Sequence, residues 1–229
     1  MENQKQSSSM LGKIVGPALA AIPGVGGVLA AIWNEWDTSR RFKRVEEFLC
    51  DFRKQIETIS AFNPKEIEDK DIQILEEIIR RVQIEHREVK RKRFANLLVN
   101  SWTENRNLPF EDNMRFVRAL DEFDDIHINI LMLLSSNEKC FGYSEIGEKL
   151  DIPQDKWHFL LLPPLEQLAS KYGFIKRGWN LSDPQNVGPV LRTTHLSPEG
   201  IARKCEHTIS PMGNAFLSSI KNGNSVAKL

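Results

Sequence analysis

Three side chains near the C-terminal end of the chain are of types that bind zinc, namely His195, Cys205 and His207. A protein zinc site needs three or four such ligands held in a compact arrangement. The spacing His-x9-Cys-x-His matches no common zinc pattern, and no fourth ligand accompanies it. The sequence therefore predicts no metal site.

A cluster of carboxylates at Asp121, Glu122, Asp124 and Asp125 could perform acid–base chemistry or hold a divalent cation. No glycine turn and no ladder of further ligands supports a metal loop. The cluster stands directly before an apolar stretch that we expect to be helical, and acidic side chains stabilise a helix N-terminus. We therefore predict that these residues cap that helix.

Motifs of well-known enzyme classes are missing from the sequence. There is no Walker phosphate loop, no Gly-x-Ser-x-Gly nucleophile elbow and no His-Glu-x-x-His motif. We therefore expect a protein that is not an enzyme, with no catalytic residues, no cofactor and no small-molecule substrate. Its expected partners are other proteins or further copies of itself.

The strongest basic run consists of Lys90, Arg91, Lys92 and Arg93. Such a run could contact phosphate or an acidic lipid. Glutamates stand two and five residues before it, and charges at helical spacing pair with one another. The favoured interpretation is a solvated helical face paired by its neighbours.

Composition bounds the class of protein. The chain has 229 residues, which suits one large domain or two small ones, with 31 basic and 31 acidic side chains. A dedicated nucleic-acid binder is usually basic, because phosphate neutralisation supplies most of its affinity. Three widely spaced cysteines form no disulfide framework, which indicates a reducing compartment. We expect the cytoplasm, with association to the inner membrane as an extension.

The segment from Ile14 to Trp33 contains 20 residues without a charge, after a polar tail (1–10) that we expect to be disordered. Three interpretations stay open: a buried helical hairpin, a hairpin or single span inserted in a membrane, and a signal peptide, which the interruptions disfavour. Proline and glycine should break this segment in water but are tolerated in a membrane. Its defining residues are Ile14, Gly16, Pro17, Pro23, Gly24, Gly26, Gly27 and Trp33.

An amphipathic helix is predicted over residues 40–59, where apolar side chains recur at steps of three and four. Arg40, Arg41, Lys43 and Arg44 crowd its start. If the preceding segment enters a membrane, these cations lie at its edge and favour the cytoplasmic side. The alternative is an ordinary solvated helical face.

Further helices complete an expected N-terminal helical domain over residues 11–120. Asn63 is expected to cap a helix whose apolar side chains run to Val82. A second stripe runs from Val89 to Trp102, with His86 as a core or boundary residue. Another helix is predicted over residues 109–123, and Cys50 is expected to be a small buried residue.

The remaining residues, 121–220, are expected to form a second domain, followed by a tail (221–229). The predicted order is an apolar helix (125–135), a short strand (140–143), a helix capped by Ser144, a helix divided by prolines (154–171) and strands at 174–179 and 190–196. Ser-Pro-x-Gly segments are expected to start helices at about 197 and 211. This order, with the sequences LEQLASKYGFIKRG and ISPMGNAFLSSI, resembles the winged helix-turn-helix fold.

Recognition of DNA requires exposed Arg, Lys, Asn or Gln on the recognition helix. Residues 155–168 offer few such side chains among many leucines. Lys176, Arg177 and Arg192 could contact phosphates from the wing. We therefore favour a winged helix used for protein contact, and a DNA-binding transcription regulator is the alternative.

Two stretches in the middle of the chain resemble the Abi-alpha abortive-infection family of bacterial phage-resistance proteins. They are EVKRKRFANLLVNSW (88–102) and FVRALDEFDDIHINILMLL (116–134), and both are helix-packing patterns without catalytic residues. The resemblance covers about 60% of the chain. It implies a bacterial protein, cytoplasmic or associated with the inner membrane, that acts as an interaction or effector protein in phage defence and has no established enzymatic activity.

Overall fold

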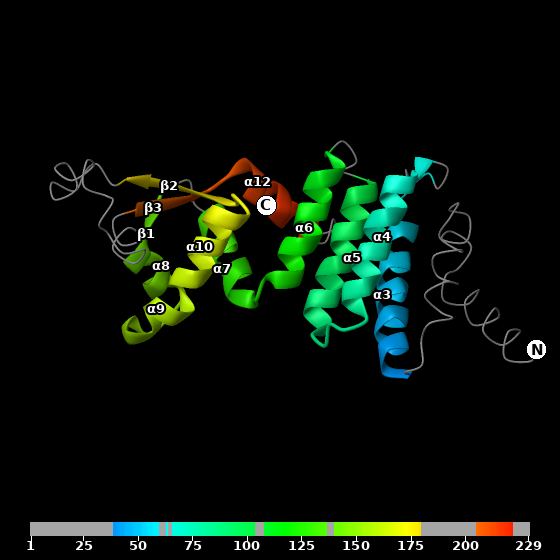
Figure 1. The fold of residues 1–229 in the computed structure, drawn as a ribbon, viewed down its shortest axis with the longest axis horizontal. Helices are drawn as coiled ribbons and strands as arrows, with labels where there is room; N and C mark the ends of the chain where they lie inside the picture. Colours follow the sequence, from blue (N-terminus) through cyan, green and yellow to red (C-terminus); the bar gives the residue numbers. More distant parts are fainter. Residues whose placement is uncertain are drawn as a thin grey trace, which may run out of the picture. The chain divides into compact units, whose positions relative to one another are not determined.

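The computed structural model describes residues 39–59, 63, 66–103, 108–136, 140–179 and 205–221 (Figure 1). These residues are mainly helical and include a small antiparallel sheet of three strands. Contacts divide the chain into unit 1, residues 1–121 and 219–229, and unit 2, residues 122–218. The apolar segment 14–33, the tail 1–10, Arg192 and His195 lie outside the described residues.

Unit 1 contains α3 (Ser39–Glu57), α4 (Asp69–Val82), α5 (Glu88–Trp102) and most of α6 (Phe110–Glu122). The predicted apolar stripes form its core, because each helix presents one face of side chains at steps of three and four. Phe52 packs edge-on against Trp102, with ring centroids 5.0 Å apart. Further buried side chains are Val45, Phe48, Leu75, Ile78, Val82, Phe94, Leu97, Leu98, Phe116 and Leu120.

Two buried asparagines on α5 fasten the C-terminal residues of unit 1. The side-chain amide of Asn96 donates to the carbonyl oxygen of Ile220 at 2.9 Å, and that of Asn100 to the carbonyl of Ser219 at 2.7 Å. The last carbonyls of a helix have no partner within the helix, so these amides satisfy groups that burial would otherwise leave unpaired. Residues 219–221 are therefore part of unit 1, whereas the sequence suggested that residues 219 and 220 end the second domain and that residue 221 begins the tail.

The start of α4 corrects one prediction. The helix begins at Asp69, and the side chains of Glu68 and Asp71 form a capping box there. Asn63 donates instead to the side chain of Glu66 at 2.9 Å. A capping box satisfies two backbone N–H groups at once, so it sets the helix start in preference to the upstream asparagine.

Two further predictions, for residues just before and at the start of α5, are wrong. His86 is exposed in the connection that precedes the helix, and Val89 is 59% exposed, so neither belongs to the core stripe. The buried positions of α5 begin at Lys90 and Arg91, whose charged side chains occupy the face that periodicity assigned to solvent.

Unit 2 begins with Phe123 and α7 (Asp125–Ser135) and continues through short elements before the sheet. The sheet order is β1-β3-β2, and both pairings are antiparallel. The elements from α7 to β2 lie close to their predicted places. The elements after α7 are β1 (Phe141–Gly142), α8 (Tyr143–Lys149), η2 (Gln154–Lys156), α9 (Trp157–Leu160), α10 (Leu162–Glu166), η3 (Gln167–Lys171), β2 (Ile175–Trp179), β3 (Cys205–Ile209) and α12 (Pro211–Ile220).

Two turns show the expected backbone chemistry. Gly173 has φ of +66°, the left-handed conformation that glycine adopts readily after a helix, and it ends the helical segment before β2. Ser210 caps α12 by accepting a hydrogen bond from the Gly213 amide at 3.0 Å, with Pro211 as first helical residue.

Other local expectations for unit 2 are wrong. Ser144 does not cap α8, which starts one residue earlier, after Gly142. Cys205 begins a strand, and the helix start expected at about 197 lies outside the described residues. The strand that pairs along all of β2 is Cys205–Ile209, a segment with no predicted strand, whereas residues 190–196 lie outside the described residues.

An aromatic cluster forms the core of unit 2. The ring of Phe123 meets those of Tyr172, Phe174 and Phe216 edge-on at centroid distances of 5.1, 5.9 and 5.6 Å. Edge-to-face packing places the positive edge of one ring on the negative face of another, which adds to the burial of apolar area. The connection before α7, the turn before β2 and helix α12 therefore meet at one aromatic centre.

Among the described residues, no helix is both long and apolar enough to cross a lipid bilayer.

Candidate functional site

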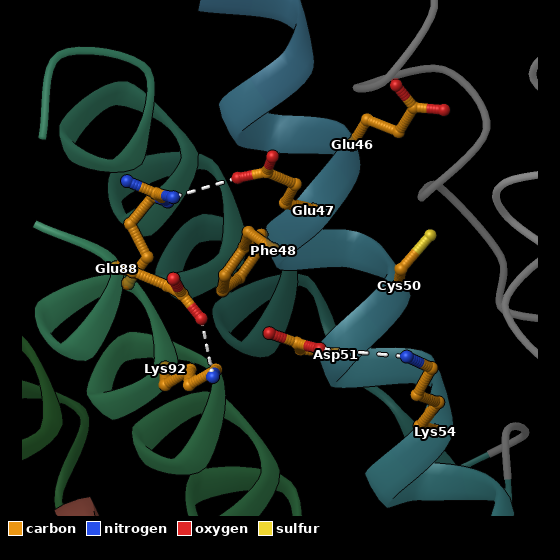
Figure 2. Close-up of a pocket in the computed structure, with 9 residues that line it drawn as sticks. Glu46, Glu47, Phe48, Cys50, Asp51, Lys54, Glu88 and Lys92 are labelled. Carbon is orange, nitrogen blue, oxygen red and sulfur yellow. Dashed lines mark hydrogen bonds and ion pairs between the residues drawn. The ribbon is translucent and has the colours of Figure 1, made fainter. Parts of the chain in front are cut away.

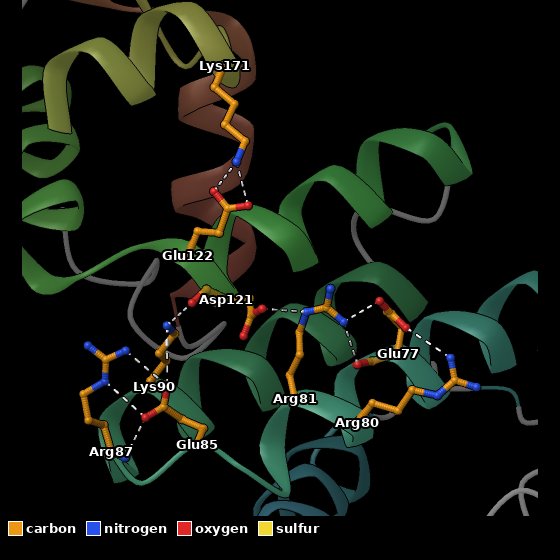
Figure 3. A network of polar contacts seen from close by, with 9 residues as sticks. All are labelled: Glu77, Arg80, Arg81, Glu85, Arg87, Lys90, Asp121, Glu122 and Lys171. Atoms are coloured by element: carbon orange, nitrogen blue, oxygen red, sulfur yellow. Dashed lines mark hydrogen bonds and ion pairs between the residues drawn. The ribbon is translucent and has the colours of Figure 1, made fainter. Parts of the chain in front are cut away.

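The side chains of the basic run 90–93 form ion pairs and hydrogen bonds within unit 1, and Figure 3 shows those of Lys90. The Lys90 ammonium is buried, donates to the carbonyl oxygen of Asp121 and lies 3.4 Å from the Glu85 carboxylate. Burial lowers the pKa of Lys90, and the neighbouring Arg87 lowers it further, against the opposing effect of the two acids. The prediction of a solvated face is wrong for Lys90, because its charge is satisfied within the protein.

The Glu85 carboxylate pairs with two cations, Lys90 and Arg87. Burial by itself would raise the pKa of Glu85, but hydrogen bonds from Arg87 and the charge of Lys90 outweigh it and lower the pKa to about 2. The guanidinium Nε of Arg87 lies 3.1 Å from the carboxylate. Glu85 is therefore an ionised anchor and not a proton donor near neutral pH.

The other members of the run are also paired. Arg91 is buried, its guanidinium lies 2.8 Å from the carboxylate of Glu47 on α3, and it also donates to the carbonyls of Glu85 and His86. Lys92 pairs with Glu88 one turn earlier at 2.6 Å, as its helical spacing predicts. Arg93 is engaged as well. We find no free phosphate-binding group in this run.

The four carboxylates of the acidic cluster have different partners and do not act together. Asp121 pairs with Arg81 at 3.3 Å in unit 1, and Arg81 also pairs with Glu77 (Figure 3). In unit 2, Glu122 accepts from Lys171 at 2.7 Å and from Gln167 at 2.9 Å. The predicted capping role is therefore wrong for Asp121 and Glu122.

Asp124 does cap α7, as predicted. Its side chain accepts from the backbone of His127, and the ring Nδ1 of His127 accepts from the Asp124 amide at 3.1 Å. Asp125 lies in the first turn of the same helix. These carboxylates stabilise local structure and converge on no common point, which argues against an acid–base pair among them.

A polar groove of about 470 Å³ lies between α3 and α5 (Figure 2). Its charges are largely matched: Glu47 with Arg91, Glu88 with Lys92, and Asp51 with Lys54 at 3.9 Å. Because these pairs neutralise one another, the groove favours neither an anionic nor a cationic ligand. Its full lining is Glu46, Glu47, Phe48, Cys50, Asp51, Lys54, Glu88, Arg91 and Lys92.

Cys50, predicted to be buried, is partly exposed and carries a free thiol on the wall of this groove. The angular position of residue 50 on α3 lies beside the apolar face and not within it, which is why periodicity overestimates its burial.

The three residues considered for zinc form no described site. His195 lies outside the described residues, and Cys205 and His207 stand two apart on β3. His207 is fully buried, and burial together with the charge of Arg177 lowers its pKa to about 4. No group of metal-ligating side chains occurs among the residues that the structure describes.

An exposed apolar surface on α9 of unit 2 was not singled out from the sequence. Phe159 is 74% exposed and Leu160 is 48% exposed. Trp157 fixes the helix, since its indole N–H donates to the carbonyl of Ile152 at 2.7 Å and its ring packs edge-on against Tyr143 at 5.7 Å. We call Phe159 and Leu160 the α9 surface.

Gly147 on α8 permits this attachment of α9. A Cβ atom added at Gly147 would lie 2.5 Å from the Trp157 indole, so only glycine allows the ring to approach. The sequence signal that could have exposed the α9 surface is the unbroken apolar run from Phe159 to Leu162, which exceeds what one buried face of a helix accommodates.

Lys176 and Arg177, the two cations of the predicted wing that the structure describes, differ in whether they are free to bind a phosphate. Lys176 on β2 is exposed. Arg177 donates to the carbonyl of Leu165 at 3.2 Å and pairs with Glu166 at 2.9 Å. Only Lys176 of this pair is therefore positioned as a free phosphate contact.

Comparisons with protein-family models, with curated proteins and with solved structures find no match to this chain. The resemblance to the Abi-alpha family therefore stays a prediction made from the two helical stretches alone.

Proposed function

We propose that this chain is a non-enzymatic interaction protein that acts in bacterial phage defence and binds a protein partner through the α9 surface. The exposure of Phe159, an aromatic ring held on an anchored helix, is the observation that supports this most directly. Large aromatic side chains in such positions are typical of binding hot spots. The defence role rests on the resemblance to the Abi-alpha family.

A winged-helix assignment for unit 2 is part of this proposal. It is supported by the order of α7, β1, α8, the α9–α10 region, β2 and β3, together with the strand order β1-β3-β2. In that fold the helix before the second strand recognises DNA. Here the corresponding region exposes Phe159 and Leu160, which suits a protein partner better than base edges.

The test is a phage-plating assay across many phages, with cells that carry the gene, lack it, or carry the variant F159S/L160S. The matched control is I84S/V89S, which removes two apolar side chains of unit 1 that are 56% and 59% exposed. We expect the wild-type gene and the control to lower plaque numbers, and F159S/L160S to restore them at equal protein levels.

The assay tests the defence role and the α9 surface separately. Unchanged plaque numbers with the wild-type gene would count against the defence role. Protection by F159S/L160S equal to that of wild type would remove the α9 surface as the functional site while leaving defence in place.

A winged-helix transcription regulator is the second candidate, and the exposed Lys176 on β2 is the observation that favours it. Phosphate contacts give binding that weakens steeply with salt. Titration of double-stranded DNA with the full chain at low salt tests it. No binding at low salt would remove this candidate, whereas binding that K176Q weakens would favour it over the protein-contact role.

A further inference from the structure

The exposed cations of unit 1 gather at the start of α3. Arg40, Arg41 and Lys43 are exposed, and none of them forms an ion pair or hydrogen bond with another side chain in the described part of the chain. Arg44 differs, since its guanidinium donates to the carbonyl of Gln83 at 2.7 Å. We call Arg40, Arg41 and Lys43 the basic turn.

The basic turn does not serve the helix that carries it. The positive end of the helix dipole lies at the N-terminus, so cations there are unfavourable and acids are favoured. The first turn of α3 contains no acidic residue. Since the three charges neither pair nor cap, their position calls for a partner outside the described fold.

The sequence before α3 indicates what that partner is. The uncharged segment Ile14–Trp33 ends on a tryptophan six residues before Ser39, and a second tryptophan, Trp36, stands between it and the basic turn. An apolar stretch of bilayer length, then tryptophan, then cations is the order found at the cytoplasmic edge of a membrane. A nucleic acid would explain the cations but neither the tryptophans nor the apolar stretch.

We propose that the basic turn of α3 binds the headgroups of anionic phospholipids and so places α3 at a membrane surface. The side chains of Arg40, Arg41 and Lys43 supply the charge, and lipid phosphates supply the partners that the protein itself does not. This inference is independent of the α9 surface, which belongs to unit 2.

The experiment measures partitioning of the full chain onto lipid vesicles. Neutral vesicles contain phosphatidylcholine alone, and anionic vesicles contain about three parts of it to one part of phosphatidylglycerol, enough negative charge to attract a basic cluster. The variant R40Q/R41Q/K43Q removes the basic turn. The control K70Q/R118Q/K221Q removes the same net charge from exposed positions elsewhere.

We expect the wild type and the control to bind anionic vesicles alike. The basic-turn variant should bind on the order of 100-fold more weakly, because each Lys or Arg near an anionic surface contributes about a factor of five. Added salt should weaken the wild type towards the level of the variant, since exposed charges are screened. All variants should keep the circular dichroism of the wild type.

Three results would overturn the proposal. The first is equal binding of the wild type to neutral and anionic vesicles, and the second is equal loss in the basic-turn variant and the control. The third is an absence of vesicle binding together with DNA binding that the basic-turn variant loses, which would assign these cations to a nucleic acid.

Discussion

Two basic segments of nearly identical composition have opposite surroundings in unit 1. In Lys90–Arg93 the first two side chains are buried and satisfied by Glu85, Glu47 and backbone carbonyls. In Arg40–Lys43 the cations are exposed and unpaired within the described residues. A basic run is therefore evidence for a phosphate or lipid site only after its internal partners are known.

The energetic consequences of the two surroundings should also be opposite. Removing one partner of a buried pair leaves the other charge uncompensated, which is costly. Removing an exposed cation from a helix N-terminus should cost nothing or stabilise the helix. Substitutions in the buried segment should therefore change stability, and substitutions in the exposed segment should change binding.

The largest effect is expected at Lys90. The substitution Lys90→Ala leaves Glu85 and the Asp121 carbonyl without the buried ammonium and should lower the free energy of unfolding by about 3 kcal/mol. Denaturant unfolding measures it. The control Lys43→Ala should stay within about 0.5 kcal/mol of wild type. Similar losses of stability in the Lys90 and Lys43 variants would show that the two segments do not differ in this way.

A second test is offered by His207, a buried ionisable side chain on β3. Its pKa of about 4 lies below the usual value of 6.5, so the neutral form is favoured in the folded state. The resulting stability is present above about pH 6.5 and is lost as the pH falls towards 4, because the unfolded chain binds the proton first.

We expect unit 2 of the wild type to lose roughly 2 kcal/mol between about pH 7 and pH 5 relative to His207→Leu, which cannot titrate at this position. The charged groups that act on His207 are Arg177 on β2 and Glu166 on α10. Parallel unfolding curves for the two proteins at both pH values would show that this histidine is not held neutral by the fold.

The smallest effect should be a gain of stability at the basic turn. Replacing Arg40 and Arg41 by glutamate places acids at the positive end of the α3 dipole and should raise the free energy of unfolding by about 0.5 kcal/mol. The same variant should lose binding to anionic vesicles. A variant that is destabilised would show that these arginines support the fold, which would weaken the lipid proposal.

Much of the secondary structure could be predicted because it depends on local chemistry. Apolar spacing located α3, α5 and α7 to within a few residues, and it located the end of α4 at Val82. Gly173 and Ser210 marked the ends of their elements, since a left-handed residue and a capping hydroxyl act on their immediate neighbours. The exceptions, such as the α4 start at Glu68, arose where two local signals competed.

The candidate surfaces could not be predicted in the same way. Lys90 and Arg91 look like solvent-facing charges until α3 and the end of α6 bring Glu47 and the Asp121 carbonyl to them from distant parts of the chain. From the sequence, Phe159 resembles a core residue. In the structure, Trp157 is the aromatic side chain of α9 that packs on Tyr143 and Gly147, and Phe159 stays exposed. In both cases the burial of one residue depends on a neighbour that the sequence does not place.

The sequence by itself thus determined the mainly helical class, the uncharged segment 14–33, the order of elements from α7 to β2 and the net charge of zero. These follow from composition and from interactions between residues a few positions apart. Only the tertiary structure decided which basic run keeps its charges free, which carboxylates are structural and which aromatic side chain stays in water. Those outcomes depend on desolvation and on partners supplied by distant segments, and neither quantity is a property of a local sequence pattern.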